Sequence, residues 1–192
     1  MTQAIDRAEA KYRAIAADLS LELASSAVER DLRAGAPDEE IQRLRETGLL
    51  PLVVPSPYGG AGASWAEALK IVQELAKADG SIGQLYGNHL NLTTLAEVGG
   101  TPVQAEFYYH QTVERNLFWA NAINTRDERL RLTPEGDHYR ANGVKSFGTG
   151  VVEADYRVFS AVQDGVEAPP LFVIPKDREG LVYNDDWDNI GQ

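Results

Sequence analysis

The chain has 192 residues, 43% of them hydrophobic and 24% charged, a composition that allows a sizeable core and argues against wholesale disorder. Its 29 acidic residues outnumber 18 basic ones, and a formal charge of −11 repels phosphate backbones and anionic lipid, so we expect no nucleic-acid or membrane partner. The absence of cysteine excludes disulfides and thiolate zinc sites in the chain, and the three histidines are scattered, so we expect no metal centre.

Residues 1–116 carry helical patterns. Apolar residues at three-, four- and seven-residue intervals predict a first helix, and these are Ile5, Tyr12, Ile15, Leu19 and Leu23. This helix ends at the segment 34–37, because its proline cannot continue a helix. A second helix is predicted over 38–47, with Gly48 as its C-terminal residue.

Further helices have recognisable start signals. Ser64 and Glu67 have the spacing of a capping box and predict a helix over 65–78. Ser81 is the expected cap of the next helix. Thr101, followed by a proline, predicts the start of another. The first part of the chain is therefore expected to be an all-helical domain.

After Asn116 the pattern changes to short strands separated by turn signals. The apolar or alternating runs are 117–120, 130–133, 139–147, 156–162 and 171–174. We therefore predict an α+β protein, with an N-terminal helical domain at 1–116 and a β-domain at 117–192. The regular turns favour an antiparallel sheet or small barrel for the β-domain.

The two ends of the chain give separate indications. The longest apolar stretches are shorter than a membrane span and the N-terminus has no apolar signal core, so we expect a soluble, cytoplasmic protein. The last residues, 187–192, do not have the pattern of a terminal tail. The β-domain would still need closing, so we expect it to be incomplete.

Taken singly, the residues that could carry chemistry leave alternatives open. His89, on a predicted helix, is either a hydrogen-bonded structural histidine or a proton donor and acceptor near a ligand. Asn121 and Asn124 suit recognition of a heterocycle, but asparagine is also common in turns. Small hydroxyls and glycines at 145–150 suit a flat ligand or a β-bulge. The glycines of 59–62 lack the Lys-Ser/Thr pair of a phosphate loop, which favours a structural loop.

Three motifs, in order and suitably spaced, resemble the acyl-CoA dehydrogenase fold. Residues 48–62 are similar to its G-L-L … V-P-x-x-Y-G-G-x-G hallmark, and residues 74–81 to the helix junction that follows. Residues 142–150, followed by Ala154-Asp155, are similar to a strand of its middle domain. The resemblance implies an N-terminal helical domain and a middle β-barrel domain, without the C-terminal four-helix domain. In that fold flavin binds between the middle and C-terminal domains.

The residues after the first predicted strand indicate a branch of this family. Dehydrogenases have a Thr-Glu-Pro-x-x-Gly-Ser-Asp segment there, whereas residues 120–127 are Ala-Asn-Ala-Ile-Asn-Thr-Arg-Asp. Residues 84–89, 119–124 and 187–192 are instead similar to the reduced-flavin monooxygenases, which include dibenzothiophene monooxygenase and amine N-oxygenases. The resemblance therefore favours the monooxygenase branch.

This branch implies a two-component monooxygenase. It would take reduced FMN from a separate flavin reductase and use O₂ to oxygenate a sulfur- or amine-containing small molecule, through a C4a-hydroperoxyflavin. Family members are commonly tetramers, so a homo-oligomer is expected. Two alternatives remain: an FAD-dependent acyl-CoA dehydrogenase, and a truncated module of the same fold without catalytic activity.

The resemblance also assigns roles to residues of this sequence. His89 would be the acid/base of the pocket, and the Thr149 hydroxyl would lie near the reactive edge of the flavin ring. The expected cofactor contacts are Asn121, Asn124, Lys145, Ser146, Phe147 and Thr149. Trp187 would pack near the substrate. The implied chemistry requires no metal.

Overall fold

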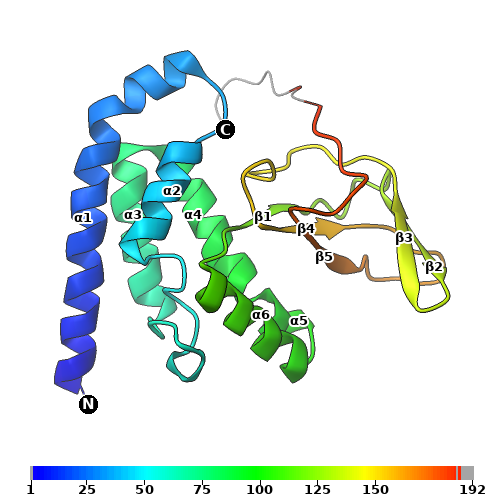
Figure 1. Cartoon of the computed structure of the whole chain (residues 1–192), viewed down its shortest axis with the longest axis horizontal. Helices are drawn as coiled ribbons and strands as arrows, with labels where there is room; N and C mark the ends of the chain where they lie inside the picture. The colour runs from blue at the N-terminus through cyan, green and yellow to red at the C-terminus, as the bar shows by residue number, and fades with distance from the viewer. Residues whose placement is uncertain (1, 185, 187–192) are drawn as a thin grey trace.

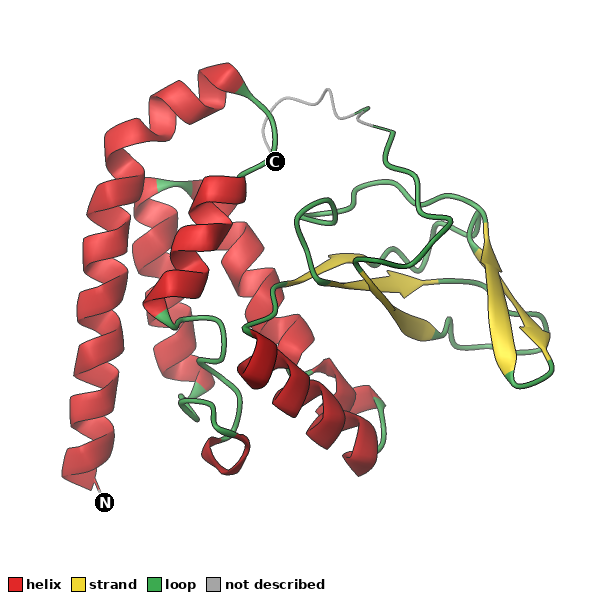
Figure 2. Ribbon diagram, viewed as in Figure 1, coloured by secondary structure: helices red, strands yellow, loops and turns green. Residues whose placement is uncertain are grey.

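The computed structural model describes residues 2–184 and 186. The helices are α1 (Thr2–Arg33), α2 (Asp38–Thr47), the 3₁₀ turn η1 (Ser56–Tyr58), α3 (Trp65–Ala78), α4 (Gly80–Thr93), α5 (Leu95–Gly99) and α6 (Pro102–Arg115). The strands are β1 (Trp119–Ala122), β2 (Arg131–Glu135), β3 (His138–Asn142), β4 (Tyr156–Ser160) and β5 (Leu171–Pro175). Helices gather on one side of the molecule and strands on the other (Figures 1 and 2), so the α+β prediction is confirmed.

Two helix starts differ in detail from the prediction. The Ser64 hydroxyl accepts a hydrogen bond from the Glu67 N–H at 3.2 Å, as expected, but the Glu67 carboxylate turns to Arg13 of α1 instead of completing the capping box. The cap of α4 is Asp79 and not Ser81, because the Asp79 carboxylate accepts from the Ser81 N–H at 2.9 Å. A carboxylate at this position also complements the positive end of the helix dipole.

The main core runs from the helices into the strand half. Its buried members on α1 to α4 include Leu19, Leu44, Ile71, Leu75, Leu85, Tyr86 and Leu90. Phe118, Ala120 and Ala154, which follow α6 in the chain, belong to the same cluster. The helices and the sheet therefore share buried apolar surface, which stabilises their relative placement.

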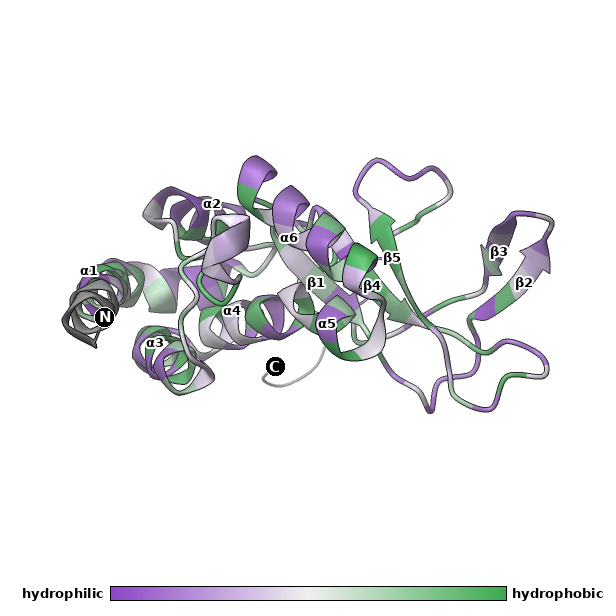
Figure 3. Ribbon diagram, turned by 90° about the horizontal axis from the view of Figure 1, so that it is seen from below, coloured by the Kyte–Doolittle hydropathy of each residue, from purple (hydrophilic) through white to green (hydrophobic). Residues whose placement is uncertain are grey.

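A second, aromatic cluster fixes α6 against the sheet. The Trp119 ring lies 5.2 Å from that of Tyr108 on α6 and 4.9 Å from that of Tyr156 on β4, both edge to face. The Trp119 Nε1–H donates to the Thr112 hydroxyl at 2.9 Å, so its polar atom is also satisfied. Seen from below, α5 and α6 lie over β1 and β4 (Figure 3).

The sheet topology corrects the antiparallel prediction. The order is β1-β4-β5, with β1 and β4 parallel and β4 and β5 antiparallel, while β2 and β3 form a separate antiparallel hairpin. Residues 123–155 join β1 to β4, and this is long enough for the crossover that parallel strands require. Within the described residues these strands do not close into a barrel.

The helices have mixed surfaces. In Figure 3 hydrophilic and hydrophobic residues alternate along them, as expected for helices that bury one face only. None of the helices in the described part of the chain combines the length and apolarity needed to cross a membrane.

Candidate functional site

Asn121 and Thr149 lie side by side where the helices meet the sheet. The Asn121 N–H donates to the Thr149 carbonyl at 3.4 Å, and the two residues form an antiparallel bridge. Residues directly opposite in such a bridge place their side chains on the same face. The Asn121 Oδ1 accepts from the Ile123 N–H at 3.1 Å, which leaves its Nδ2 as the part of the amide that can donate to a ligand. Both side chains are half-buried, so an amide and a hydroxyl share one face.

The turn after Thr149 packs closely against α4. Gly150 has φ +68°, and a Cβ built on it would lie 2.6 Å from the Leu85 Cδ2. Only glycine combines this conformation with so close an approach. The helical core therefore determines how far the 145–150 segment lies from β1.

The polar side chains of Lys145 and Ser146 are used within the chain. The Lys145 ammonium donates to the carbonyls of Asn124 at 2.7 Å and Asp127 at 2.6 Å. The Ser146 hydroxyl accepts from Arg129 at 2.7 Å. Burial lowers the pKa of Lys145. These contacts hold the loop after β1 against the 145–150 segment.

Phe147 is the aromatic residue of this segment. Its backbone has φ +58°, which is uncommon for a residue with a side chain. The residue is 66% exposed. Backbone strain with an exposed aromatic ring is typical of a binding surface more than of a core position. Phe147 is therefore a candidate for the apolar part of a binding site.

His89 is fully buried at the junction. Its Nε2 lies 2.8 Å from the Leu50 carbonyl, and its Nδ1 accepts from the Trp119 N–H at 3.1 Å. A ring that donates through Nε2 and accepts through Nδ1 is the neutral form with the proton on Nε2. Burial lowers the pKa of His89 to about 4. Since both ring nitrogens are bonded to backbone groups, the geometry favours the structural interpretation of His89.

Sequence reasoning missed the Arg45–Asp155 ion pair, which ties α2 to the start of β1. The Asp155 Oδ2 accepts from the Arg45 guanidinium at 2.7 Å and from the Phe118 N–H at 2.7 Å. Arg45 also donates to the Asn116 carbonyl. The signal for this ion pair in the sequence is the Ala154-Asp155 pair at the end of the third motif.

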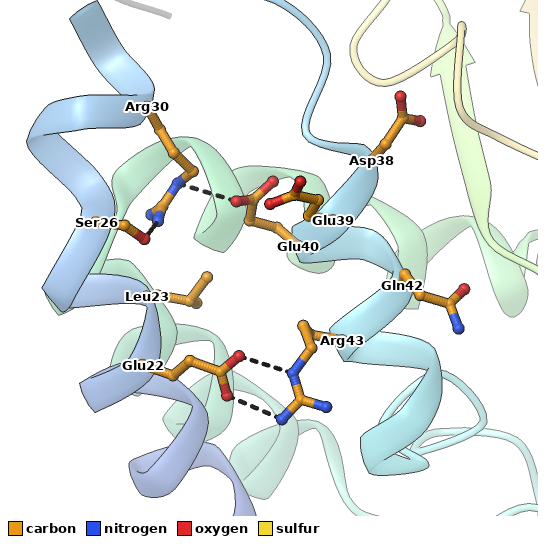
Figure 4. A pocket seen from close by; sticks show the side chains of 9 residues that line it. All are labelled: Glu22, Leu23, Ser26, Arg30, Asp38, Glu39, Glu40, Gln42 and Arg43. Atoms are coloured by element: carbon orange, nitrogen blue, oxygen red, sulfur yellow. Dashed lines mark hydrogen bonds and ion pairs between the residues drawn. The ribbon is translucent and has the colours of Figure 1, made fainter. Parts of the chain in front are cut away.

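The remaining predictions concern other parts of the chain. Trp187 lies outside the described residues. Among those residues, no group of three or more histidine, aspartate or glutamate side chains could hold a metal ion. A cavity of about 510 Å³ lies between α1 and α2 (Figure 4), and none of the predicted flavin contacts lines it.

Comparison with known proteins shows the family of this chain. Residues 8–115 match the model of the acyl-CoA dehydrogenase N-terminal domain, which is more than half of the chain. The chain belongs to the acyl-CoA dehydrogenase family. The resemblance inferred from the three motifs is thereby confirmed.

Within the acyl-CoA dehydrogenase family the chain is similar to flavin monooxygenases. It is 37% identical to a probable FMNH2-dependent monooxygenase of Pseudomonas putida, over 93% of this chain and 46% of that protein. It is 38% identical to dibenzothiophene monooxygenase of Rhodococcus erythropolis, over 97% of this chain and 47% of that protein. The chain spans about half the length of these relatives.

Two solved structures have a similar backbone arrangement. Methanesulfinate monooxygenase from Pseudomonas fluorescens superposes with a TM-score of 0.87 at 38% identity, over 92% of this chain and 46% of that one. FMN-bound TdsC from Paenibacillus sp. A11-2 superposes with a TM-score of 0.85 at 31% identity, over 95% of this chain and 47% of that one.

Proposed function

We propose that this chain forms the N-terminal and middle parts of a two-component flavin monooxygenase. The enzyme would use reduced FMN and O₂ to oxygenate a sulfur- or amine-containing small molecule. The monooxygenase relatives support this, at 37–38% identity against 27% for isovaleryl-CoA dehydrogenase of Pongo abelii. The absence of a Thr-Glu-Pro segment from residues 120–127 supports it as well.

The structural observation that carries the proposal is the bridge between Asn121 and Thr149. The residues around it fit a flavin, because a flat heterocycle needs an apolar surface and a few polar groups on one face. Phe147 would supply the surface, Asn121 an amide donor and Thr149 a hydroxyl. When bound, reduced FMN supplies the electrons that activate O₂ for oxygen transfer to the substrate.

The chain's own residues would hold and orient the ligands. The Thr149 hydroxyl can donate a hydrogen bond to polar atoms at the edge of the ring, and the Asn121 Nδ2–H can orient the ring or the substrate. Phe147 would exclude water from one side of the site. Trp187 is the proposed substrate contact.

Asn124, Lys145 and Ser146, three of the predicted cofactor contacts, would fix the backbone conformation of the site. Lys145 bridges two carbonyls of the 124–127 turn, and Ser146 holds Arg129. The Asn124 N–H donates to the Ser160 hydroxyl at 3.0 Å, which ties the same loop to β4. We propose that Asn124, Lys145 and Ser146 contact the cofactor through the backbone they organise. His89 would act as a positioning residue that holds β1 to the helices.

The proposed chemistry also indicates partners. Free reduced FMN is consumed by O₂, so a flavin reductase must supply it in the same compartment, for which we propose the cytoplasm. The substrate would be a small molecule. A homo-oligomer, a tetramer for the longer protein, remains part of the proposal.

The decisive experiment tests oxygen transfer by the protein. A flavin reductase supplies it with reduced FMN under ¹⁸O₂. Dibenzothiophene and methanesulfinate serve as sulfur substrates, and mass spectrometry measures ¹⁸O in the product. We expect ¹⁸O in the product only when substrate is present, and with FMN but not with FAD. Anaerobic bleaching of bound FAD by an acyl-CoA thioester would instead favour the dehydrogenase. Oxygen consumption without labelled product would count against the proposal.

Binding can be tested separately on this chain. Titration with reduced and oxidised FMN, followed by flavin fluorescence and absorbance, measures the affinity. Thr149→Val should weaken FMN binding by about tenfold, the equivalent of one hydrogen bond. Thr125→Val, at an exposed threonine after β1, is the matched control and should leave the affinity unchanged.

A further inference from the structure

The cavity between α1 and α2 is separate from the proposed flavin site. In Figure 1 the last turns of α1 bend towards α2, and Figure 4 shows the side chains that line the space between them. On α1 the Ser25 hydroxyl donates to the Glu22 carbonyl at 2.7 Å, a local bond that competes with regular helix geometry. The cavity between α1 and α2 has a volume of about 510 Å³, a size suited to a small ligand.

The lining of this cavity is predominantly acidic. Four carboxylates, from Glu22, Asp38, Glu39 and Glu40, face two guanidinium groups, from Arg30 and Arg43. The lining therefore carries two more negative than positive charges. The buried Leu23 side chain adds an apolar wall. Charge of one sign in a recess attracts ligands of the other sign.

Glu40 supplies the observation that points to a ligand. The residue is only 6% exposed, and its Oε2 is buried with no hydrogen-bond partner. In Figure 4 its carboxylate extends from α2 into the space towards α1. A buried carboxylate oxygen without a donor is costly, so a native structure normally provides one.

In the structure neither arginine of the lining donates to that oxygen. Arg30 directs Nε to the Glu40 Oε1 at 3.3 Å, NH1 to the Ser26 hydroxyl at 2.5 Å and NH2 to the Asp79 carboxylate at 2.6 Å. The nitrogens of Arg43 are bonded to the carboxylates of Glu22 and Glu46. The guanidinium groups of the site are therefore directed to other partners, and Oε2 has no donor within the structure.

We propose that this cavity binds a small organic cation with N–H donors, a primary alkylammonium, through Glu40. The ammonium would donate to Oε2, and its alkyl part would lie along Leu23. A metal ion is a poorer fit, since no group of three or more suitable ligands occurs among the described residues. The site does not depend on flavin chemistry.

The test uses three probes of similar size with this chain. 1,4-Diaminobutane has charge and N–H donors, tetramethylammonium has charge without donors, and 1,4-butanediol has donors without charge. Nuclear magnetic resonance shifts of the Ser26, Arg30 and Glu40 amides measure binding. We expect saturable shifts with the diamine only. Equal shifts with tetramethylammonium, or none with the diamine, would overturn the proposal.

Variants locate the interaction. Glu40→Gln should weaken diamine binding at least tenfold, while Glu46→Gln, which removes an exposed carboxylate bonded to Arg43, should leave it unchanged. Circular dichroism checks that both variants fold. If Glu40→Gln fails to fold, Glu39→Gln, at an exposed residue of the lining, should weaken binding several-fold. Undiminished diamine binding by the folded variant, Glu40→Gln or Glu39→Gln, would overturn the proposal. This result does not depend on any flavin measurement.

Discussion

The imidazole of His89 joins α4 to the first residue of β1. Its Nδ1 accepts from the Trp119 N–H at 3.1 Å, while its Nε2 donates to the Leu50 carbonyl at 2.8 Å. One side chain therefore satisfies two buried backbone groups that come from distant parts of the chain. The Phe118 ring stacks on it at 5.3 Å between centroids. Trp119 is in β1, the strand that also carries Asn121.

Replacing His89 by alanine should destabilise the fold. The change leaves the Trp119 N–H and the Leu50 carbonyl buried without partners and adds a cavity, which together cost about 3 kcal/mol of unfolding free energy. Urea denaturation measures the effect. The matched control is His138→Ala, at a residue with a 66% exposed side chain, which should change stability by less than about 0.5 kcal/mol. An unchanged denaturation midpoint for His89→Ala would contradict the structural role.

The same histidine should make stability depend on pH. Burial, with a smaller contribution from Arg45, lowers the pKa of His89 from 6.5 to about 4, while the Leu50 carbonyl and Asp155 act in the opposite direction. Between these values the unfolded chain binds the proton and the folded chain does not. Stability is therefore full above pH 6.5 and is lost as the pH falls towards 4, by about 3 kcal/mol in total.

The measurement is the unfolding free energy of the wild type and of His89→Gln across this pH range. Glutamine keeps polar contacts but does not titrate, so the difference between the two curves isolates His89 from the carboxylates. The lowered pKa of Glu67, caused mainly by its hydrogen bond to Arg13, adds its own loss of stability in more acidic solution. Parallel curves for the two proteins would show that His89 does not cause the dependence.

The Arg45–Asp155 pair should be energetically coupled. A double-mutant cycle with Arg45→Met and Asp155→Asn should give a coupling free energy of about 1 kcal/mol or more, because both side chains are mostly buried and each also bonds to the backbone of residues 116–118. The exposed pair Glu22–Arg43 is the control, and its cycle should give less than about 0.5 kcal/mol. Equal coupling in the two cycles would show that burial does not strengthen the Arg45–Asp155 pair.

Gly150→Ala should destabilise more than an ordinary glycine substitution. A Cβ at Gly150 would meet Leu85 at 2.6 Å, whereas Gly165, with a similar φ of +78°, has no atom within 4 Å of a Cβ. Gly165→Ala therefore measures backbone strain alone, about 1 kcal/mol. The additional overlap should raise the cost at Gly150 to about 2–3 kcal/mol, measured by thermal unfolding. Similar losses for both variants would argue against close packing at Gly150.

Local sequence patterns predicted the positions of the helices and strands better than the contacts between them. The helices at 38–47 and 65–78 have the predicted bounds, because amphipathic spacing and terminal residues act within a few positions. The cap of α4 is Asp79 and not the predicted Ser81, since two polar residues compete for neighbouring N–H groups. The strands at 156–160 and 171–175 lie where the runs 156–162 and 171–174 predict them. Alternation does not specify which strand pairs with which, or in which direction.

By itself the sequence determined the α+β class, most element positions, the family and a set of candidate residues, because these depend on local periodicity and ordered motifs. Only the tertiary structure decided that β1 pairs in parallel with β4, that Asn121 meets Thr149, and that both nitrogens of His89 are bonded to backbone groups. The physical reason is the same in each case. Burial and hydrogen bonding between residues far apart in the chain depend on packing, which no local pattern encodes.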